Sequence, residues 1–572
     1  MYKRILISIV SLLIAACGQT ERPASPTAAA ADAVYTNARI YTVDANESWG
    51  EAMAVTGGKI VAIGTAADVA AHVGDATAVH DLGGRMIMPG IHDTHIHAAL
   101  AGEMQRLQCF FLTFNLEEAL EALKGCIAET PAGEWVRGGQ WYPALFEQSD
   151  LSPREILDEI APDNPVFLMD WSWHNGWVNS MALEMFGIDS DTPNPKGGVI
   201  AKNEATGEPN GILGDTAAYS MMRQLPAYSI DDRMSALEWS LGQISQHGVT
   251  TIKEAITTTS IAETYREMSE QGRLPMRIKN SLTWKNEFAR SHGEELELIA
   301  DRADFGTDNI DNSFAKIMLD GVPIPPVYTA AMLEPYTPSD QYPEGWRGKL
   351  IFEPEELNPD VVELDRLGLS VKIHATGDWS LRAALDAFEA ARKTNGDSGV
   401  IHEVSHAELI HPDDIPRFAE LNVAAEMCPI LWHPVPGLTW DVWLGQDRKP
   451  WPIKSLVEAG ALVTYGSDWS VVPTPNPWPG IEAMVTRADP SGMLEGTLWP
   501  EQAVDLATTI RIFTLNSAIA NKAGDHSGSL EVGKDADFIV LDRNIFDVPI
   551  TDVGDTRVLI SVVGGTATIN KL

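Results

Sequence analysis

Both ends of the chain alternate apolar and polar residues in the way that is typical of short β-strands. Near the N-terminus, ADAVYTNARIYTVD and EAMAVTGGKIVAIGT show this alternation, and a Gly-Gly pair in the second stretch signals a turn. GKDADFIVLDRN and RVLISVVGGTATIN repeat the pattern near the C-terminus. We therefore predict one small β-sandwich domain that both termini build together, from residues 34–86 and 519–572.

The middle of the chain, residues 87–518, alternates short β-rich runs with longer stretches of helical spacing such as LRAALDAFEAARK. Eight such units predict an α/β fold, a (β/α)8 barrel of the TIM type. The eight candidate strands are MIMPGIHDTHIH, GVTTIKEAI, MRIKNSLTW, FAKIMLDG, LSVKIHATGD, VIHEVSHAEL, NVAAEMCPI and ALVTYGSDW.

A long segment, residues 98–233, separates the first two candidate strands, and it is rich in tryptophan and proline. An insertion after a barrel strand lies at the C-terminal face of the barrel, where active sites form. We expect this insertion to act as a lid over the site.

Residues 1–16 have the pattern of a signal peptide, because Lys3 and Arg4 precede an apolar run that is too short to favour a membrane-spanning helix. The small residues before Cys17 resemble a bacterial lipoprotein cleavage box, which predicts lipid attachment at Cys17. A plain secretory signal with an incidental cysteine is the alternative. The residues from 17 to 33 then form a flexible tether. We expect an exported bacterial lipoprotein, periplasmic or anchored to the outer membrane, that meets a membrane only through this anchor.

Composition and charge narrow the classes of function. The chain has 572 residues, 44% of them hydrophobic, which is enough for a sizeable core. Its formal net charge of −39 and the lack of a basic patch exclude nucleic acid as an expected partner. An oxidising compartment would permit a Cys109–Cys126 disulfide, although free buried thiols fit the sequence equally well.

Polar residues at the ends of the candidate strands carry the chemistry. The first strand ends in DTHIH, and a period of two places Asp93, His95 and His97 on one face and His92 on the other. Two imidazoles on one face can grip a metal ion, and Asp93 is a candidate to support them. Further polar residues at strand ends are Lys316 on the fourth strand, His374 on the fifth, His406 on the sixth and Asp468 on the eighth.

With these polar residues at the ends of successive strands, the sequence resembles the metal-dependent amidohydrolase superfamily, and within it the amidohydrolase-3 branch of N-substituted formamide deformylase-like proteins. The resemblance runs in order over most of the chain after the tether. The matching stretches are MPGIHDTHIH, WHNGWVNSMALE, GEPNGILGD, AKIMLDG, KIHATGDWSLRAALDAFE, SHAELI, YGSDW and GSLEVGKDADFIVLD.

The resemblance implies a centre of two zinc ions, with other divalent metals as alternatives. It implies that the lysine is carboxylated by CO2 and bridges the metals as an anionic carbamate; an ordinary salt bridge from Lys316 to Asp320 is the alternative. The implied metal ligands are His95, His97, Lys316, His374, His406 and Asp468.

The resemblance also implies roles for two catalytic residues. Asp468 would take a proton from a metal-bridging hydroxide and deliver it to the departing amine; a helix cap after the strand is the alternative. His174 in the insertion would approach the substrate or the oxyanion, and a buried histidine among tryptophans is an equal alternative. For Trp171, Trp173 and Trp177 we expect a place in the core of the insertion rather than in a substrate wall.

The stretch HEVSH, from His402 to His406, matches the H-E-x-x-H string of zinc peptidases. Such a string needs a helix, in which residues i and i+4 share a face. Here it follows the turn cluster NGDSG and ends shortly before Pro412, which favours a strand. We expect His406 alone of this string to bind metal, and we assign no metal role to His92, His402, His411 or His433.

The sequence thus predicts an exported metal-dependent amidohydrolase that hydrolyses a non-peptide C–N bond of a small molecule. A lactonase, carbamate hydrolase or other ester hydrolase would use the same site. A surface-anchored lipoprotein that only binds a ligand is an alternative of another class, against which the presence of Lys316 and Asp468 argues. The sequence leaves the substrate and the oligomeric state open.

Overall fold

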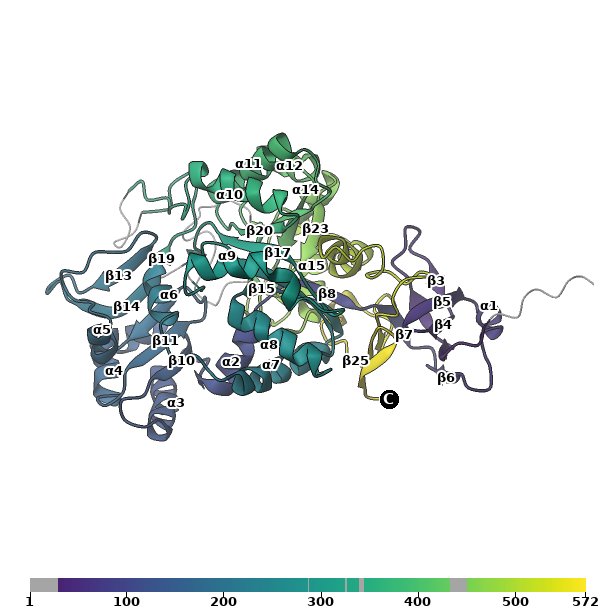
Figure 1. Cartoon of the computed structure of the whole chain (residues 1–572), viewed down its shortest axis with the longest axis horizontal. Coiled ribbons are helices and arrows are strands. Elements are labelled where there is room, and N and C mark those ends of the chain that lie inside the picture. The colour runs from purple at the N-terminus through teal and green to yellow at the C-terminus, as the bar shows by residue number, and fades with distance from the viewer. Residues whose placement is uncertain (1–28, 287, 325–326, 339–343, 433–449) are drawn as a thin grey trace, which may run out of the picture.

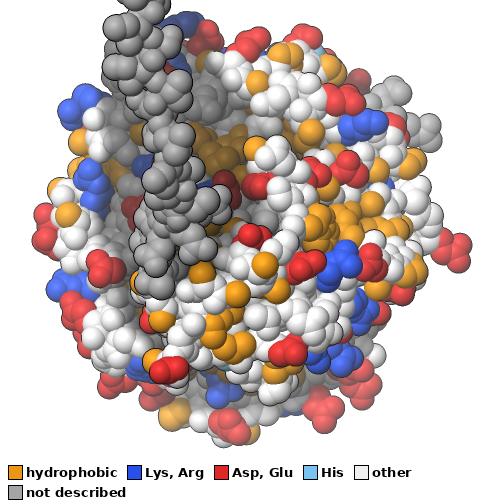
Figure 2. Space-filling model, turned by 90° about the vertical axis from the view of Figure 1, so that its right-hand side faces the viewer, with side chains coloured by type: hydrophobic (Ala, Val, Ile, Leu, Met, Phe, Trp, Pro, Cys, Tyr) orange, Lys and Arg blue, Asp and Glu red, His pale blue; other side chains and the backbone are white. Residues whose placement is uncertain are grey.

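The computed structural model describes residues 29–572 except 287, 325–326, 339–343 and 433–449. The predicted signal peptide, Cys17, most of the tether and His433 therefore lie outside the described residues. Among the described residues, no helix is both long and apolar enough to cross a bilayer. On the face seen in Figure 2, acidic side chains are spread among lysines and arginines rather than gathered into one patch.

Eight parallel strands form the central sheet, which confirms the predicted (β/α)8 barrel and all eight candidate strands. At the closing seam, Thr94 Oγ1 donates a hydrogen bond to the Tyr465 carbonyl at 2.8 Å. The strand residues are nearly all buried, as expected for a parallel sheet covered by helices. In sheet order the strands are β8 (Ile91–Ile96), β15 (Val249–Thr257), β16 (Arg277–Thr283), β17 (Ile310–Met318), β20 (Ser370–His374), β21 (His402–Ser405), β22 (Val423–Met427) and β23 (Leu462–Tyr465).

Helices cover the outside of this barrel (Figure 1). The stretch LRAALDAFEAARK lies in α11 (Asp378–Asn395), whose buried face includes Leu381, Leu385 and Phe388 at the spacing of helical turns. The other helices between and after the strands include α7 (Ile230–Ser245), α8 (Thr259–Glu270), α9 (His292–Ala300), α10 (Pro354–Arg366), α12 (Ile415–Glu420), α14 (Ile453–Glu458), α15 (Trp478–Thr486), α16 (Leu506–Arg511) and α17 (Ser517–Ala520).

Two sheets built from both termini form the additional β domain at one end of the molecule (Figure 1). Their core includes Ile40, Ile60, Phe538 and Val562. One sheet holds β5 (Lys59–Gly64), β4 (Ala52–Thr56), β1 (Ala33–Thr36) and β6 (Ala78–Asp81). The other holds β26 (Thr566–Asn570), β25 (Val558–Val563), β24 (Phe538–Leu541), β7 (Met86–Pro89), β2 (Arg39–Tyr41) and β3 (Trp49–Gly50).

The first candidate strand divides between the two domains, which the sequence pattern did not predict. Its MIMP part is β7, which pairs with β24 and β2, and its second part is barrel strand β8. Gly90 stands at the division, where a Cβ would lie 2.2 Å from Thr250 Oγ1. Only glycine fits this close approach of the chain to strand β15.

The segment after β8 builds a layer of its own beside the barrel (Figure 1). The segment begins with α2 (Ala98–Leu107), which packs against α7, and continues with a six-stranded sheet, four α-helices and the short 3-10 helix Pro143–Gln148. Gln140 Nε2 donates to the Ser470 carbonyl at 2.8 Å, so this layer contacts the loop after β23, and Cys109 and Cys126 form a disulfide within it. The sheet order is β13 (Gly198–Lys202), β14 (Pro209–Asp215), β12 (Asn175–Val178), β11 (Val166–Asp170), β10 (Val136–Trp141) and β9 (Cys109–Phe110), and the helices are α3 (Leu116–Glu129), α4 (Pro153–Ile160), α5 (Ser180–Met185) and α6 (Thr216–Met222).

Candidate metal centre

His95, His97 and Asp468 meet where β8 and β23 end. His95 Nε2 and His97 Nε2 lie 3.6 and 3.3 Å from Asp468 Oδ1. The Asp468 amide donates to the His95 carbonyl at 2.8 Å, and the His97 amide donates to the Trp469 carbonyl at 2.6 Å. These two hydrogen bonds hold the strand ends together and fix all three side chains. Asp468 caps no helix, because the next one, α15, begins only at Trp478.

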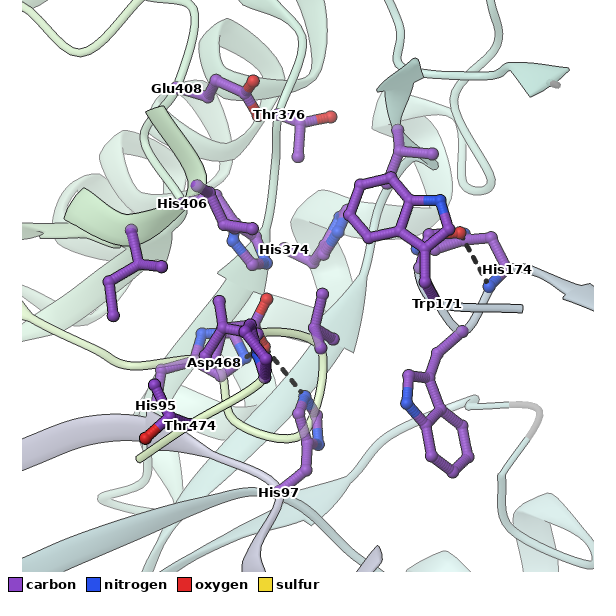
Figure 3. A pocket seen from close by; sticks show the side chains of 18 of the residues that line it. His95, His97, Trp171, His174, His374, Thr376, His406, Glu408, Asp468 and Thr474 are labelled. Atoms are coloured by element: carbon purple, nitrogen blue, oxygen red, sulfur yellow. Dashed lines mark hydrogen bonds and ion pairs between the residues drawn. The ribbon is translucent and has the colours of Figure 1, made fainter. Parts of the chain in front are cut away.

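His374, His406 and Lys316 complete the group of predicted ligands (Figure 3). The His406 ring centroid lies 4.8 Å from that of His95 and 4.7 Å from that of His374. Lys316 Nζ donates to Ser405 Oγ at 3.2 Å. All six predicted ligands, brought from five strands, line one cavity of about 610 Å³, and His174 lines it too.

Asp320 is the anchor of His374 and makes no ion pair with Lys316. Its Oδ1 lies 3.1 Å from His374 Nδ1, which leaves Nε2 of that ring for the cavity. Its Oδ2 accepts hydrogen bonds from the amides of Ala331 and Gly377, both at 3.0 Å. The alternative role for Lys316, a salt bridge to this aspartate, is therefore wrong.

Burial sets the protonation states of this group. It holds the pKa values of His95 and His406 well below the usual range, because burial removes water that would stabilise an imidazolium. Burial, followed by repulsion from the Lys372 ammonium, lowers the pKa of Lys316 to about 7. Neutral imidazoles are the form that binds metal, and a free amine is the form that reacts with CO2.

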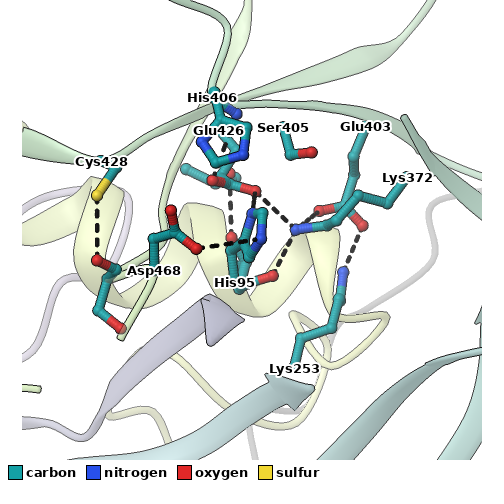
Figure 4. A network of polar contacts seen from close by, with 12 residues as sticks. His95, Lys253, Lys372, Glu403, Ser405, His406, Glu426, Cys428 and Asp468 are labelled. Carbon is teal, nitrogen blue, oxygen red and sulfur yellow. Dashed lines mark hydrogen bonds and ion pairs between the residues drawn. The ribbon is translucent and has the colours of Figure 1, made fainter. Parts of the chain in front are cut away.

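Behind His95 lies a row of four buried, alternating charges that the sequence analysis missed (Figure 4). Glu426 Oε2 lies 2.8 Å from both His95 Nδ1 and Lys372 Nζ. Lys372 also contacts Glu403 at 3.3 Å, and Glu403 pairs with Lys253. All four charged side chains are fully buried, with two positive and two negative charges. The row therefore balances its own charge and fixes the His95 ring so that Nε2 faces Asp468.

His174 reaches the cavity from the insertion, held by a partner that the sequence did not reveal. Its Nδ1 lies 2.6 Å from Asp215 Oδ1 and 3.2 Å from the Tyr219 hydroxyl. Burial alone would lower the pKa of His174, but the hydrogen bond and charge of Asp215 raise it above its usual value. The ring centroid lies 6.0 Å from that of His374, so His174 lies beside the ligand group.

The insertion supplies an aromatic wall that leads from the surface into the cavity. Phe114, half exposed, stacks on Tyr142 with ring centroids 4.2 Å apart, and Tyr142 stacks on Trp171 at 5.8 Å. All three line the cavity, as does Trp173. The expectation that the tryptophans belong to the core holds for Trp177, which is fully buried. It holds in part for Trp173, which packs against the core of the insertion as well as lining the cavity, and it is wrong for Trp171.

The remaining candidates lie outside the centre. Asp93 accepts hydrogen bonds from the His95 and Ser467 amides and so supports the strand ends rather than an imidazole. The first four residues of HEVSH form strand β21 and His406 follows it, so the string is not helical, as predicted, and is not the peptidase motif. His402 is buried against Asp365 at 3.0 Å, away from the cavity. The His92 ring is hydrogen-bonded to the Ser527 hydroxyl, and His411 caps the start of a short 3-10 helix near the surface.

The donor set fits a metal centre. The candidate ligand atoms of His95, His97 and Asp468 lie within 4.8 Å of one another, and so do those of His95, His406 and Glu426. Nδ1 of His97 is buried with no hydrogen-bond partner, although buried polar atoms are normally paired. Neutral imidazole and carboxylate ligands in this number suit zinc or a similar divalent ion.

Comparisons with known proteins show the family and the fold of this chain. The sequence profile of the amidohydrolase family matches residues 78–569. N-substituted formamide deformylase from Arthrobacter pascens is 28% identical over 550 residues, which cover 93% of this chain and 97% of that protein. An uncharacterized metal-dependent hydrolase from Pyrococcus horikoshii shares the fold, with a TM-score of 0.70 at 22% identity over 91% of this chain and 99% of that one. Zinc-complexed atrazine chlorohydrolase from Arthrobacter aurescens shares it at a TM-score of 0.51 and 15% identity, over 94% and 95% of the chains.

Proposed function

Since this chain belongs to the amidohydrolase family and is a hydrolase of carbon–nitrogen bonds, we propose that it cleaves a non-peptide amide of a small molecule at the cavity described above. The observation that carries the proposal is the convergence of six candidate ligands from five strands in one cavity. The aromatic wall of Phe114, Tyr142 and Trp171 favours a substrate with an apolar or aromatic group.

We propose that the centre would hold two zinc ions and that Lys316 would carry a CO2-derived carbamate as one of their ligands. The lowered pKa of Lys316 supports this, because it leaves a free amine near neutral pH. The ions would supply an activated water at neutral pH and polarise the substrate carbonyl. The residues that would hold them are His95, His97, Lys316, His374, His406 and Asp468.

Asp468 is the proton shuttle of the proposed reaction. Its carboxylate lies beside His95 and His97, so it can accept a proton from the attacking water. It then returns this proton to the departing amine nitrogen, because an amine leaves poorly unless it is protonated. The hydrogen bonds that join the ends of β8 and β23 hold it at this place.

His174 stabilises the negative charge that forms on the carbonyl oxygen. Asp215 engages Nδ1, so Nε2 is the ring nitrogen left to donate into the cavity. The raised pKa of His174 keeps that donor protonated over a wider pH range than an unpaired imidazole. His174 belongs to the insertion, so the insertion completes the site as well as covering it.

Export remains part of the proposal. Residues 1–16 would be removed, Cys17 would carry the lipid, and residues 17–33 would tether the enzyme, as a periplasmic or outer-membrane-anchored lipoprotein. The disulfide between Cys109 and Cys126 supports an oxidising compartment. We keep the division into a β domain of residues 34–86 and 519–572, a barrel of 87–518 and a lid of 98–233 as part of this proposal.

The test is a hydrolysis screen with purified, zinc-loaded protein against N-formyl amines, N-acyl amino acids, cyclic amides and lactones. We expect hydrolysis of an amide, its loss on chelation, and a kcat at least about 100-fold lower in Asp468→Asn. Full activity of Asp468→Asn would overturn the proposed shuttle. Hydrolysis of lactones alone would favour the ester hydrolase, and binding without any hydrolysis would favour the non-catalytic lipoprotein.

A further inference from the structure

The Tyr219 hydroxyl carries a proton that no described residue accepts. Among the described residues, its one hydrogen-bonding neighbour is Nδ1 of His174, at 3.2 Å. That nitrogen is already committed, because the Asp215 carboxylate, 2.6 Å away, can only accept and therefore takes the Nδ1 proton. A ring nitrogen that bears a proton cannot accept a second one, so Tyr219 cannot donate to it.

The other carboxylate near this hydroxyl, that of Asp170, is fully occupied. Its Oδ1 accepts from the amides of His174 and Asn175, both at 3.0 Å. Its Oδ2 accepts from the Ser172 hydroxyl at 2.7 Å and from the side-chain amide of Asn175 at 2.8 Å. Because buried polar groups are normally paired, the hydroxyl proton of Tyr219 is left for a guest of the cavity.

Tyr219 is held firmly at the cavity wall. The residue is 7% exposed, lines the cavity, and packs its ring on Phe288 with centroids 5.0 Å apart. It lies in α6, which begins directly after Asp215, the partner of His174. Burial raises the pKa of Tyr219 well above its usual value, so the hydroxyl keeps its proton as a donor.

The donors of Tyr219 and His174 can meet at one oxygen atom. His174 lies beside His374 and donates into the cavity from Nε2 (Figure 3). Nε2 is separated from Nδ1 by a single ring carbon, so a hydroxyl next to Nδ1 is close enough to share an acceptor with Nε2. The oxygen of a tetrahedral intermediate has three lone pairs, so it can accept from both residues and still face a metal ion.

We propose that Tyr219 is a further catalytic residue, whose hydroxyl donates a hydrogen bond to the same carbonyl oxygen as His174 Nε2. The inference rests on the proposed function, because it adds a second donor where negative charge would form. Tyr219 keeps its proton throughout and makes or breaks no covalent bond, so its contribution is to stabilise this charge.

The test uses phenylphosphonate, whose charged oxygens surround a tetrahedral phosphorus, titrated calorimetrically into zinc-loaded protein. We expect Tyr219→Phe, which keeps the ring that packs on Phe288, to weaken binding at least about 10-fold. Tyr35→Phe, the same change in the core of the β domain, is the matched control and should leave the affinity unchanged. With folding checked by thermal melts, equal affinity in Tyr219→Phe, or no binding by the wild-type protein, would overturn the inference.

A second variant separates direct donation from support of His174. In a His174→Gln background, Tyr219→Phe should weaken phenylphosphonate binding further, since the hydroxyl acts on the ligand itself. No further loss would assign Tyr219 to holding His174 in place and would also overturn the inference.

The hydrolysis screen reports separately on the reaction. With an amide that the wild-type protein hydrolyses, Tyr219→Phe should lower kcat by about 100-fold with little change in KM, and an unchanged kcat would contradict a catalytic role. Absence of amide hydrolysis would end the proposed function, whereas the phenylphosphonate comparison would still decide whether Tyr219 donates to a charged oxygen.

Discussion

Replacing Glu426 by glutamine removes a single negative charge from behind the metal centre. The substitution keeps the side-chain volume. One oxygen, Oε2, now accepts from both His95 Nδ1 and Lys372 Nζ at 2.8 Å, so a glutamine oxygen could keep both hydrogen bonds. What is lost is the charge, which makes the His95 imidazole a stronger ligand and balances the buried Lys372 ammonium.

The magnitude follows from the position of this carboxylate next to a metal-binding histidine. Changes to such partners typically cost 10- to 100-fold in metal affinity, or about 1.4–2.7 kcal/mol. Burial opposes ionisation of Glu426, but the Lys372 ammonium holds its pKa below the usual value, so the wild-type group is charged at neutral pH. The affinity loss should therefore be present throughout the neutral range.

The assay is equilibrium dialysis against buffered zinc, with bound zinc counted by mass spectrometry and folding followed by circular dichroism. Glu420→Gln, exposed and close in sequence, is the matched control. An unchanged zinc dissociation constant in a folded Glu426→Gln protein would refute the reasoning, because the charge behind His95 would then have no influence on the centre.

Three further predictions concern groups around the site. Glu403→Gln leaves an excess buried positive charge, which should lower the free energy of unfolding by about 3–5 kcal/mol at pH 6 and by less at pH 9. Burial already lowers the pKa of Lys253 to about 7, so the folded state binds fewer protons than the unfolded one and the free energy of unfolding rises with pH. Urea unfolding that shows no smaller loss of stability at pH 9 than at pH 6 would contradict the charge balance. Removing the disulfide between Cys109 and Cys126, which are 17 residues apart, should lower the free energy of unfolding by about 3 kcal/mol. Alkylation of both thiols without reductant would disprove the bond. Asp215→Asn should lower kcat by about 10-fold or more with little change in KM, whereas a change in KM alone would assign this carboxylate to substrate binding.

The barrel was predictable because its strands are short β-rich runs, several of which end in a polar residue, and stretches of helical spacing separate most of them. A parallel strand that is buried on both faces is visible as such a run within its own short stretch of sequence. His374 and Asp468, at the ends of two of these runs, could therefore be recognised without knowing which strands are neighbours. The division of the first candidate strand could not, since MIMP and IHDTHI follow each other closely and both are fully buried strands. What separates them is the close approach of Gly90 to Thr250, a residue 160 positions away.

The charges behind the centre were missed for a related reason. The partner of His95 is 331 residues away, and no local pattern reports such a distance. A signal was nonetheless present in SVKIH, HEVS and VAAEM, where Lys372, Glu403 and Glu426 each place a charged residue within a barrel strand. Because charged residues are almost never fully buried unless paired, such residues in neighbouring strands predict that their side chains meet.

The metal content of the wild-type protein tests the account most directly. Protein produced with zinc and bicarbonate, freed of loosely bound metal by dialysis, should carry two zinc ions per chain, and Lys316→Ala should carry at most one. A wild-type protein that binds no divalent metal under these conditions would contradict the proposal that His95, His97, His374, His406 and Asp468 form a metal centre with this lysine.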